Sequence, residues 1–237
     1  GKMGILNSTA GSFGIGNFNP FGTGWGEVGS QTHLWGAGFE TRYNNMISYA
    51  SPEFAGLKVY AQYSFGGNYD DDGEVVGKEG KTTTNRYYGL GVTYKVGGLN
   101  LIGIVDSVNE AQTAGTFEKE DAIRATVGGS YDFGVVKPYL TVAYFKDGEI
   151  NDPFSMHQYS SNLTDNKDWE GFAVALGATA PVFGGKAHAM LGYMDAEGED
   201  TLNDGLNPKD DFTRWMVGFG YEYSLSKRTT VYADAGY

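Results

Sequence analysis

The sequence predicts an all-β fold, a transmembrane antiparallel β-barrel, and three observations support this prediction. Apolar and polar residues alternate in runs of about ten residues, which is the pattern of a strand with one apolar face. The runs come in pairs joined by short turns, whereas the connections between pairs are long and acidic. At roughly 3.3 Å per residue and a tilt of about 40°, a strand of about ten residues spans the apolar band of an outer membrane, which is about 25 Å tall.

The composition agrees with a membrane barrel and excludes several other classes. The chain has 237 residues, enough for one domain, with 37 glycines, no cysteine and a formal net charge of -12. Its 15% aromatic but only 41% hydrophobic content fits a sheet with one polar side better than a helical enzyme. The longest apolar run, 172–183, is shorter than the roughly 18 residues of a spanning helix. The negative charge argues against a nucleic-acid partner, whose phosphates need clustered lysine and arginine.

The clearest hairpin lies at 42–65. Tyr43, Ile47 and Tyr49 alternate with polar residues in the first arm, a break at 51–56 contains Pro52, and the second arm alternates from Leu57 onward. The same unit is expected four more times, at 86–107, 123–144, 172–193 and 215–237. Residues 41–237 are therefore predicted to form ten strands as five hairpins, all within a single domain of residues 1–237.

The connections and the aromatic residues predict how the strands cross the membrane. The turns near Gly56, Gly97, Gly134, Gly184 and Lys227 are short, while 67–85, 108–121, 146–168 and 196–213 are long and rich in Asp and Glu. Outer-membrane barrels have this asymmetry, with turns in the periplasm and loops outside. Two interfacial girdles are expected at the loop ends and at the turns, from Tyr43, Phe65, Tyr88, Tyr144, Trp169, Tyr193, Trp215 and from Tyr49, Tyr94, Tyr131, Phe183, Tyr223. A soluble sandwich is the alternative, but its strands are usually about five or six residues long.

The strand face opposite the apolar one is expected to line a water-filled pore. Small and polar inward residues leave room for water that a packed core excludes. That face carries Arg42, Lys58, Gln62, Thr93, Lys95, Arg124, Thr126, Lys137, Thr141, Lys186, His188 and Glu222. The residues singled out as the pore wall are its basic ones: Arg42, Lys58, Arg124, Lys137, Lys186 and Arg214. For those near strand ends, the alternative interpretation is that the long side chain reaches out to the membrane interface. Arg86 shares the parity of the lipid-facing residues and is the most ambiguous.

Catalysis and metal binding find little support in the sequence. No serine stands in a nucleophile elbow, and His33, His157 and His188 are scattered over two loops and a strand. The acidic segments 70–72 and 197–204 lack the spacing of a calcium-binding helix-loop-helix motif. No cofactor and no catalytic residue is therefore expected, although the acidic loops could bind Ca²⁺ or Mg²⁺ bridging lipopolysaccharide. An outer-membrane hydrolase and a non-conducting structural or adhesive barrel are the alternative functions.

The hairpin 42–56, reading RYNNMISYASPEFAG, resembles a signature of the trimeric general porins of Gram-negative bacteria, in their neisserial-type, beta-proteobacterial branch. The turn at 225–229, LSKRT, is similar to another turn of that family. The resemblance implies a homotrimeric, 16-stranded barrel in the outer membrane that passes ions and small hydrophilic solutes, in contact with lipid and lipopolysaccharide. It also implies that strands one to five and the closing strand are missing from this chain. A self-contained ten-stranded barrel is the minor alternative.

Residues 1–40 lie where the family has its third extracellular loop, which folds into the pore. They show no sustained alternation, and their many glycines permit close approach to a wall while their aromatic residues supply anchors. Glu27 is the only carboxylate in 1–39, so it is expected to be the principal acidic group of the constriction, with His33 and Glu40 secondary. The alternative is that Glu27 is a solvated loop charge.

Overall fold

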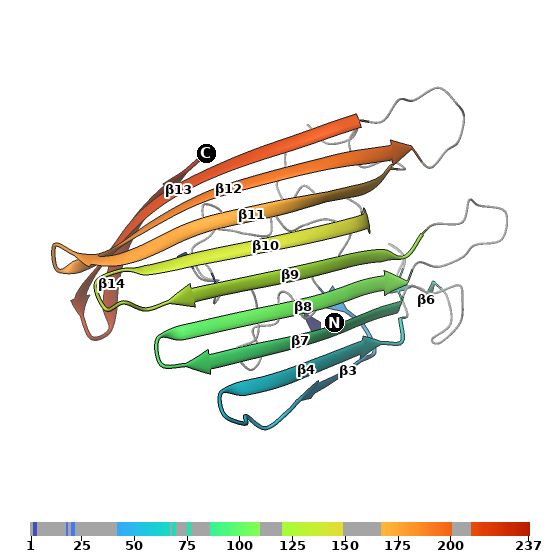
Figure 1. The fold of residues 1–237 in the computed structure, drawn as a ribbon, viewed down its shortest axis with the longest axis horizontal. Coiled ribbons are helices and arrows are strands. Elements are labelled where there is room, and N and C mark those ends of the chain that lie inside the picture. The colour runs from blue at the N-terminus through green and yellow to red at the C-terminus, as the bar shows by residue number, and fades with distance from the viewer. Residues whose placement is uncertain are drawn as a thin grey trace.

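One antiparallel sheet of ten strands dominates the fold. The computed structural model describes residues 2–3, 18, 20–21, 42–66, 68–69, 75–76, 86–109, 120–148, 167–200 and 210–237. The sheet has the order β14-β13-β12-β11-β10-β9-β8-β7-β4-β3, so its ten strands follow one another across the sheet in their order along the chain (Figure 1). Its strands are β3 (Met46–Ala50), β4 (Leu57–Ser64), β7 (Arg86–Val96), β8 (Leu99–Asn109), β9 (Ala122–Tyr131), β10 (Lys137–Gly148), β11 (Lys167–Val182), β12 (Gly185–Asp200), β13 (Asp210–Ser226) and β14 (Thr229–Gly236).

The ten strands and their all-antiparallel pairing confirm the predicted fold class. Two short ladders accompany the sheet: β1 (Lys2–Met3) pairs with β2 (Arg42–Tyr43), and β5 (Asn68–Tyr69) pairs with β6 (Val75–Val76). The second ladder lies inside 67–85, which the sequence assigned wholly to a loop. No helix long and apolar enough to cross a membrane occurs in the part of the chain that the structure describes.

The first predicted arm, 42–50, is not one continuous strand. It breaks at Asn44 and Asn45, and only the second part, β3, pairs with β4. Asn45 has a positive φ of 47°, and its side-chain amide donates a hydrogen bond of 2.8 Å to the carbonyl of Gly66. Asparagine tolerates this left-handed conformation better than most residues. A bend therefore separates Tyr43 from Ile47, although the apolar–polar alternation of the sequence continues through both.

The strands β11, β12 and β13 are longer than predicted, with 16, 16 and 17 residues. The sequence placed 196–213 in a loop, yet β12 runs to Asp200 and β13 starts at Asp210. A strand of about 16 residues at a tilt of about 40° rises roughly 40 Å, more than the apolar band. Its polar end therefore projects beyond the bilayer, where backbone pairing continues although the apolar alternation has stopped.

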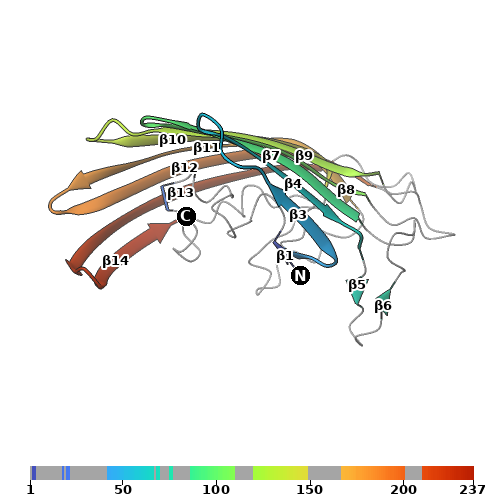
Figure 2. The same cartoon turned by 90° about the horizontal axis from the view of Figure 1, so that it is seen from below.

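The sheet is curved (Figure 2), and its two faces differ in the burial of their side chains. The convex face exposes large apolar side chains at mid-strand, including Leu90 at 63%, Leu176 at 53% and Phe219 at 60% exposure. Aromatic residues of both predicted girdles are also exposed: Tyr49, Tyr88, Tyr94, Tyr131, Tyr144, Phe183, Trp215 and Tyr223. An apolar face with nothing of the described chain over it is what a lipid-facing barrel wall requires.

Two residues assigned to the loop-end girdle belong to the concave face instead. Tyr43 is 8% exposed and stacks on Tyr87, with 4.0 Å between ring centroids. Trp169 is 1% exposed and lies against Gly198, its partner on β12. Tyr43 precedes the bend at Asn45, and Trp169 shares the parity of the buried Ala173, so neither reaches lipid. The girdle prediction is wrong for these two.

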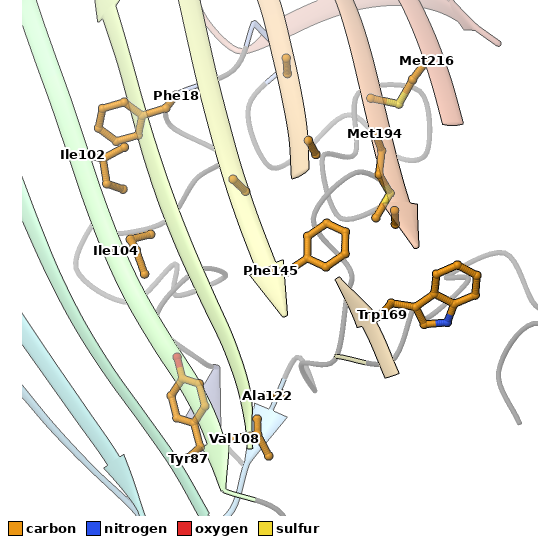
Figure 3. Packing of buried hydrophobic residues seen from close by; sticks show 14 of the residues in the cluster. Phe18, Tyr87, Ile102, Ile104, Val108, Ala122, Phe145, Trp169, Met194 and Met216 are labelled. Atoms are coloured by element: carbon orange, nitrogen blue, oxygen red, sulfur yellow. The ribbon is translucent and has the colours of Figure 1, made fainter. Parts of the chain in front are cut away.

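The buried side chains lie on the concave side of the sheet. The cluster runs across the sheet from Tyr60 on β4 to Met216 on β13 and includes Tyr43 on β2 and, from the N-terminal segment, Phe18 and Phe21. Figure 3 shows Phe18, Ile102, Phe145 and Met194 on the same side of these strands. The described part of the N-terminal segment thus covers the wall that the sequence predicts to face a pore.

Candidate pore-wall site

The predicted basic residues with described side chains all stand on the concave face. Directly opposed residues of an antiparallel ladder share a face, so the register places each one. Lys58 shares the parity of the buried Gln62, Lys137 that of the buried Thr141, and Arg214 pairs with the buried Met194. The lysine ammonium groups of Lys58 and Lys137 lie over the rings of Tyr60 and Tyr139, at 5.2 and 5.1 Å from the centroids.

Lys186 belongs to a charged group on β12 and β13. Its ammonium lies 2.5 Å from Oε1 of Glu222, the residue opposite it in the ladder. The same oxygen lies 3.8 Å from Nε2 of His188. Lys186 is 47% exposed and Glu222 25% exposed, whereas the His188 side chain is 3% exposed. The group is therefore accessible to solvent at Lys186 and almost inaccessible at His188.

Arg124 is not at the membrane interface but forms a buried ion pair. Its Nη2 and Nε donate hydrogen bonds of 2.7 and 3.0 Å to the two carboxylate oxygens of Asp106, which is directly opposite on β8. The side chains are 3% and 1% exposed. The hydroxyl of Tyr87 donates a third hydrogen bond to Asp106, at 3.1 Å. This two-pronged geometry satisfies both charges, so the pair adds no net charge to the wall.

Asp106 was absent from the residues that the sequence singled out. It shares parity with Ile102 and Ile104, which the sequence does not distinguish from a lipid-facing run. The usable signal was an acidic residue inside an otherwise apolar strand, because a charge that is buried in a sheet needs a partner. Which partner it has depends on the register of β8 against β9, which the sequence did not provide.

Residues 18, 20 and 21 contact the concave wall at three neighbouring strands. The hydroxyl of Thr141 on β10 donates to the carbonyl of Phe18 at 3.3 Å, and Nδ1 of His188 on β12 lies 2.5 Å from the carbonyl of Pro20. The rings of Phe21 and His188 are 5.7 Å apart. Between them on β11, a Cβ on Gly177 would lie 2.5 Å from Cγ of Pro20.

The ends of the N-terminal segment are also held together. Lys2 pairs with Tyr43 and Met3 with Arg42 in the β1–β2 ladder. Residues 2–3 and 42–43 therefore lie side by side. Of Arg42 only the backbone is described, and the expected constriction residues Glu27, His33 and Glu40 lie outside the described residues.

The chemistry of the described wall is that of charge and hydrogen bonding. No group of three or more His, Cys, Asp or Glu that could hold a metal ion occurs among the residues that the structure describes. Of the three histidines only His188 is described, and its Nδ1 is engaged by the carbonyl of Pro20. The predicted basic residues are spread over β4, β9, β10, β12 and β13 instead of converging on one point.

Comparison with known proteins gives a consistent result. The model of a family described as Gram-negative porin matches residues 2–237. An outer membrane porin protein of Bordetella pertussis is 27% identical over 242 residues, covering 94% of this chain and 59% of that protein. Outer membrane porin protein 32 of Delftia acidovorans is 28% identical over 197 residues, covering 83% of this chain and 46% of that protein. The chain thus spans about half the length of the curated relatives it matches.

Solved structures resemble the fold. A loop-deletion mutant of OmpT, an outer membrane protein of Vibrio cholerae, matches with a TM-score of 0.53 and 20% identity, over 91% of this chain and 61% of that one. In vitro folded OmpT matches with a TM-score of 0.51 and 20% identity, over 81% and 52%. At this identity the likeness concerns the fold alone, which is that of an outer-membrane β-barrel.

Proposed function

The chain belongs to the Gram-negative porin family, and from this premise we propose that the protein is a passive diffusion channel for ions and small hydrophilic solutes. Its location is the outer membrane, as for its porin relatives. The observation that carries the proposal is the contrast between the two faces of the ten-stranded sheet. The convex face exposes apolar side chains, while the concave face carries Lys58, Lys137, Lys186 and Arg214 together with Gly177, Gly198 and the buried apolar cluster. A wall of this kind leaves space for water next to fixed charges.

The test is single-channel recording of the mature protein purified from outer membranes, in a planar bilayer with a salt gradient. We expect the conductance to rise in steps. Vesicles that contain the channel should swell in small neutral sugars but not in sugars above a certain size. The sign of the reversal potential shows whether the channel prefers anions or cations. Basic residues on the wall favour anions, whereas acidic residues in the loops favour cations. A protein that inserts with its heat-modifiable mobility intact but never conducts would favour the non-conducting structural barrel and overturn the proposal.

We infer further that transport occurs without a catalytic step. An outer-membrane hydrolase needs a nucleophile beside a base within about 3 Å. His188, the described histidine, lies on the wall with its Nδ1 directed at the carbonyl of Pro20, a group that offers no nucleophile. Hydrolysis of ester or peptide substrates by the purified channel, abolished by His188→Ala, would contradict this inference.

We propose that residues 1–40 form the constriction, with Glu27 its principal acidic group and His33 and Glu40 secondary. The contacts of residues 18, 20 and 21 with the wall support this assignment, since they bring part of the segment to the concave face. In a narrow, poorly hydrated passage, one fixed charge acts strongly on passing ions because water screens it less.

Replacing the carboxylate by an amide tests this role of Glu27. We expect Glu27→Gln to move the reversal potential toward anion preference with little effect on folding. Glu53→Gln, in the short β3–β4 turn, is the matched control and should leave the potential unchanged. If the two variants behave alike, the assignment of Glu27 is wrong.

We also propose that the whole protein is a 16-stranded barrel that assembles as a homotrimer and contacts lipid and lipopolysaccharide. The family relationship supports this, as does a solved trimer form of Vibrio cholerae OmpT with a TM-score of 0.50 and 21% identity, matching 81% of this chain and 53% of that one. Cross-linking in mild detergent should recover trimers that dissociate on heating. Recovery of monomers alone, under conditions that preserve the heat-modifiable form, would contradict the trimer. Ca²⁺ or Mg²⁺ binding by the acidic loops stays a prediction, because 70–72 lie outside the described residues.

A further inference from the structure

We propose that His188 and Gly177 form a seat on the pore wall that fixes the position of Phe18, Pro20 and Phe21, and that this seat sets the width of the channel. The part of this proposal that concerns channel width rests on the proposed diffusion function. The part that concerns the position of these residues on the wall does not. The two parts therefore need separate measurements.

The first component of the seat is a hydrogen bond of defined polarity. A carbonyl oxygen only accepts, so the contact of 2.5 Å requires that Nδ1 of His188 carry the proton and donate it to Pro20. The other ring nitrogen then faces the carboxylate of Glu222 at 3.8 Å, which Lys186 holds from the solvent side. Thr179 and Gly220 flank His188 in the same cross-strand row. The ring is thus oriented from β13 while it binds the segment.

The second component is the absence of a side chain at Gly177. A Cβ there would lie 2.5 and 2.6 Å from Cγ and Cδ of Pro20, well inside van der Waals contact. Gly177 is not among the described residues with positive φ, so its backbone does not require glycine. Glycine is needed here for space alone, because it lets the proline ring rest on the strand.

The remaining contacts make the seat specific and rigid. Phe21 is 2% exposed beside the His188 ring, and Thr141 holds the carbonyl of Phe18 from β10. The three wall residues come from β10, β11 and β12, which are paired with one another along almost their whole length. Proline itself has no N–H and a fixed φ, so its carbonyl is the one backbone group it can offer to the wall. A segment held at several points on a rigid sheet can define an opening reproducibly.

The seat can be measured without any current. The chain contains no cysteine, so Phe18→Cys introduces a single thiol on the segment, and the Thr141 bond to the backbone carbonyl is retained. Phe18 is 6% exposed, so slow labelling by a water-soluble thiol reagent is expected. Gly177→Ala in this background should push Pro20 off the wall and speed labelling at least about five-fold, the equilibrium shift expected from losing roughly one hydrogen bond.

Two matched controls keep this experiment interpretable. Gly103→Ala adds the same methyl group to a strand glycine, where the neighbouring atom is Cγ1 of Val92 at 3.4 Å, so labelling should not change. His188→Asn retains a donor close to the position of Nδ1 and should preserve slow labelling, whereas His188→Leu should speed it about five-fold. Each variant is first checked for the heat-modifiable mobility of a folded barrel.

The outcomes separate the seat from the channel. Equal labelling rates for Gly177→Ala and Gly103→Ala, or for His188→Asn and His188→Leu, would overturn the seat. If labelling changes as expected, recording of Gly177→Ala in the native Phe18 background should show larger conductance and a higher sugar size limit. Changed labelling with unchanged conductance would show that the seat does not set the width. If labelling changes as expected but the protein never conducts, the proposal of the seat is supported and the proposed channel function is overturned.

Discussion

Asp106 and Arg124 form a buried ion pair in which each charge is compensated by the other. Both side chains are nearly inaccessible, and Tyr87 adds a hydrogen bond to the carboxylate. Removing one partner of such a pair leaves an uncompensated buried charge, which typically costs about 3–5 kcal/mol, whereas replacing both by apolar residues is often neutral. We therefore expect Arg124 to support the wall structurally beside β2, where Tyr43 stacks on Tyr87.

Single replacement of either member of the pair should destabilise the barrel strongly. We expect Asp106→Leu or Arg124→Met to lower the free energy of unfolding in detergent by about 3–5 kcal/mol, and the double variant to lower it by much less than the sum. Lys146→Met is the control, because Lys146 is 48% exposed and 3.6 Å from Asp147, an ion pair expected to contribute at most about 1 kcal/mol. Additive single effects would show that the two charges are not coupled.

At the scale of elements, the tight turns decide how hairpins join the sheet. Gly56 and Gly97 both have positive φ, 83° and 55°, but their surroundings differ. A Cβ on Gly56 would lie 2.0 Å from the carbonyl oxygen of Lys95, whereas a Cβ on Gly97 would meet no atom of the described chain within 4 Å. The Lys95 amide also donates to the Gly56 carbonyl at 2.9 Å. The β3–β4 turn is therefore tied to the end of β7 through backbone contact.

Alanine at these two glycines separates backbone strain from steric exclusion. Gly97→Ala should cost about 1–2 kcal/mol, the usual penalty for a side chain in the left-handed region. Gly56→Ala should cost clearly more and should also speed amide exchange at Lys95, because the turn must move away from β7. Denaturant titration and hydrogen exchange measure the two effects. Equal costs at both positions would mean that the contact with Lys95 yields easily.

At the scale of the whole molecule, one sheet separates two environments. Alternation places Leu90 on the convex face, while Ser48 shares the concave parity of its partner Gln62, which in turn pairs with Gly89. Leu90 and Ser48 therefore stand at nearly the same depth but on opposite sides. We predict that lipid covers much of the convex side, because a free apolar surface of this extent is not stable in water.

An arginine at each of these positions tests which side faces lipid. Leu90→Arg should destabilise folding into vesicles by about 2–4 kcal/mol, the effect of arginine near the bilayer midplane. Ser48→Arg should fold almost normally, because its side chain enters the concave side. The fraction of heat-modifiable protein after folding into vesicles, read from gel mobility across a urea series, measures both. The reverse order would exchange the two faces of the sheet.

Patterns in the amino-acid sequence alone predict ten strands, their antiparallel pairing and the apolar side of most of them. These properties follow from short-range patterns, because strand alternation has a period of two and turns need particular residues within a few positions. Alternation along β7 and β13 is therefore enough to assign Leu90 and Phe219 to the apolar side, where both are exposed. The same patterns carried the family resemblance.

Which side chains meet one another on the concave face depends on the tertiary structure and could not be predicted. Tyr43 and Trp169 turned inward, Asp106 became the partner of Arg124, and Pro20 came to rest on Gly177, far along the chain. Each of these contacts depends on the register between strands or on the return of a distant segment. Alternation along one strand contains no information on either, because contacts between distant segments are set by packing and hydrogen bonding across the whole sheet.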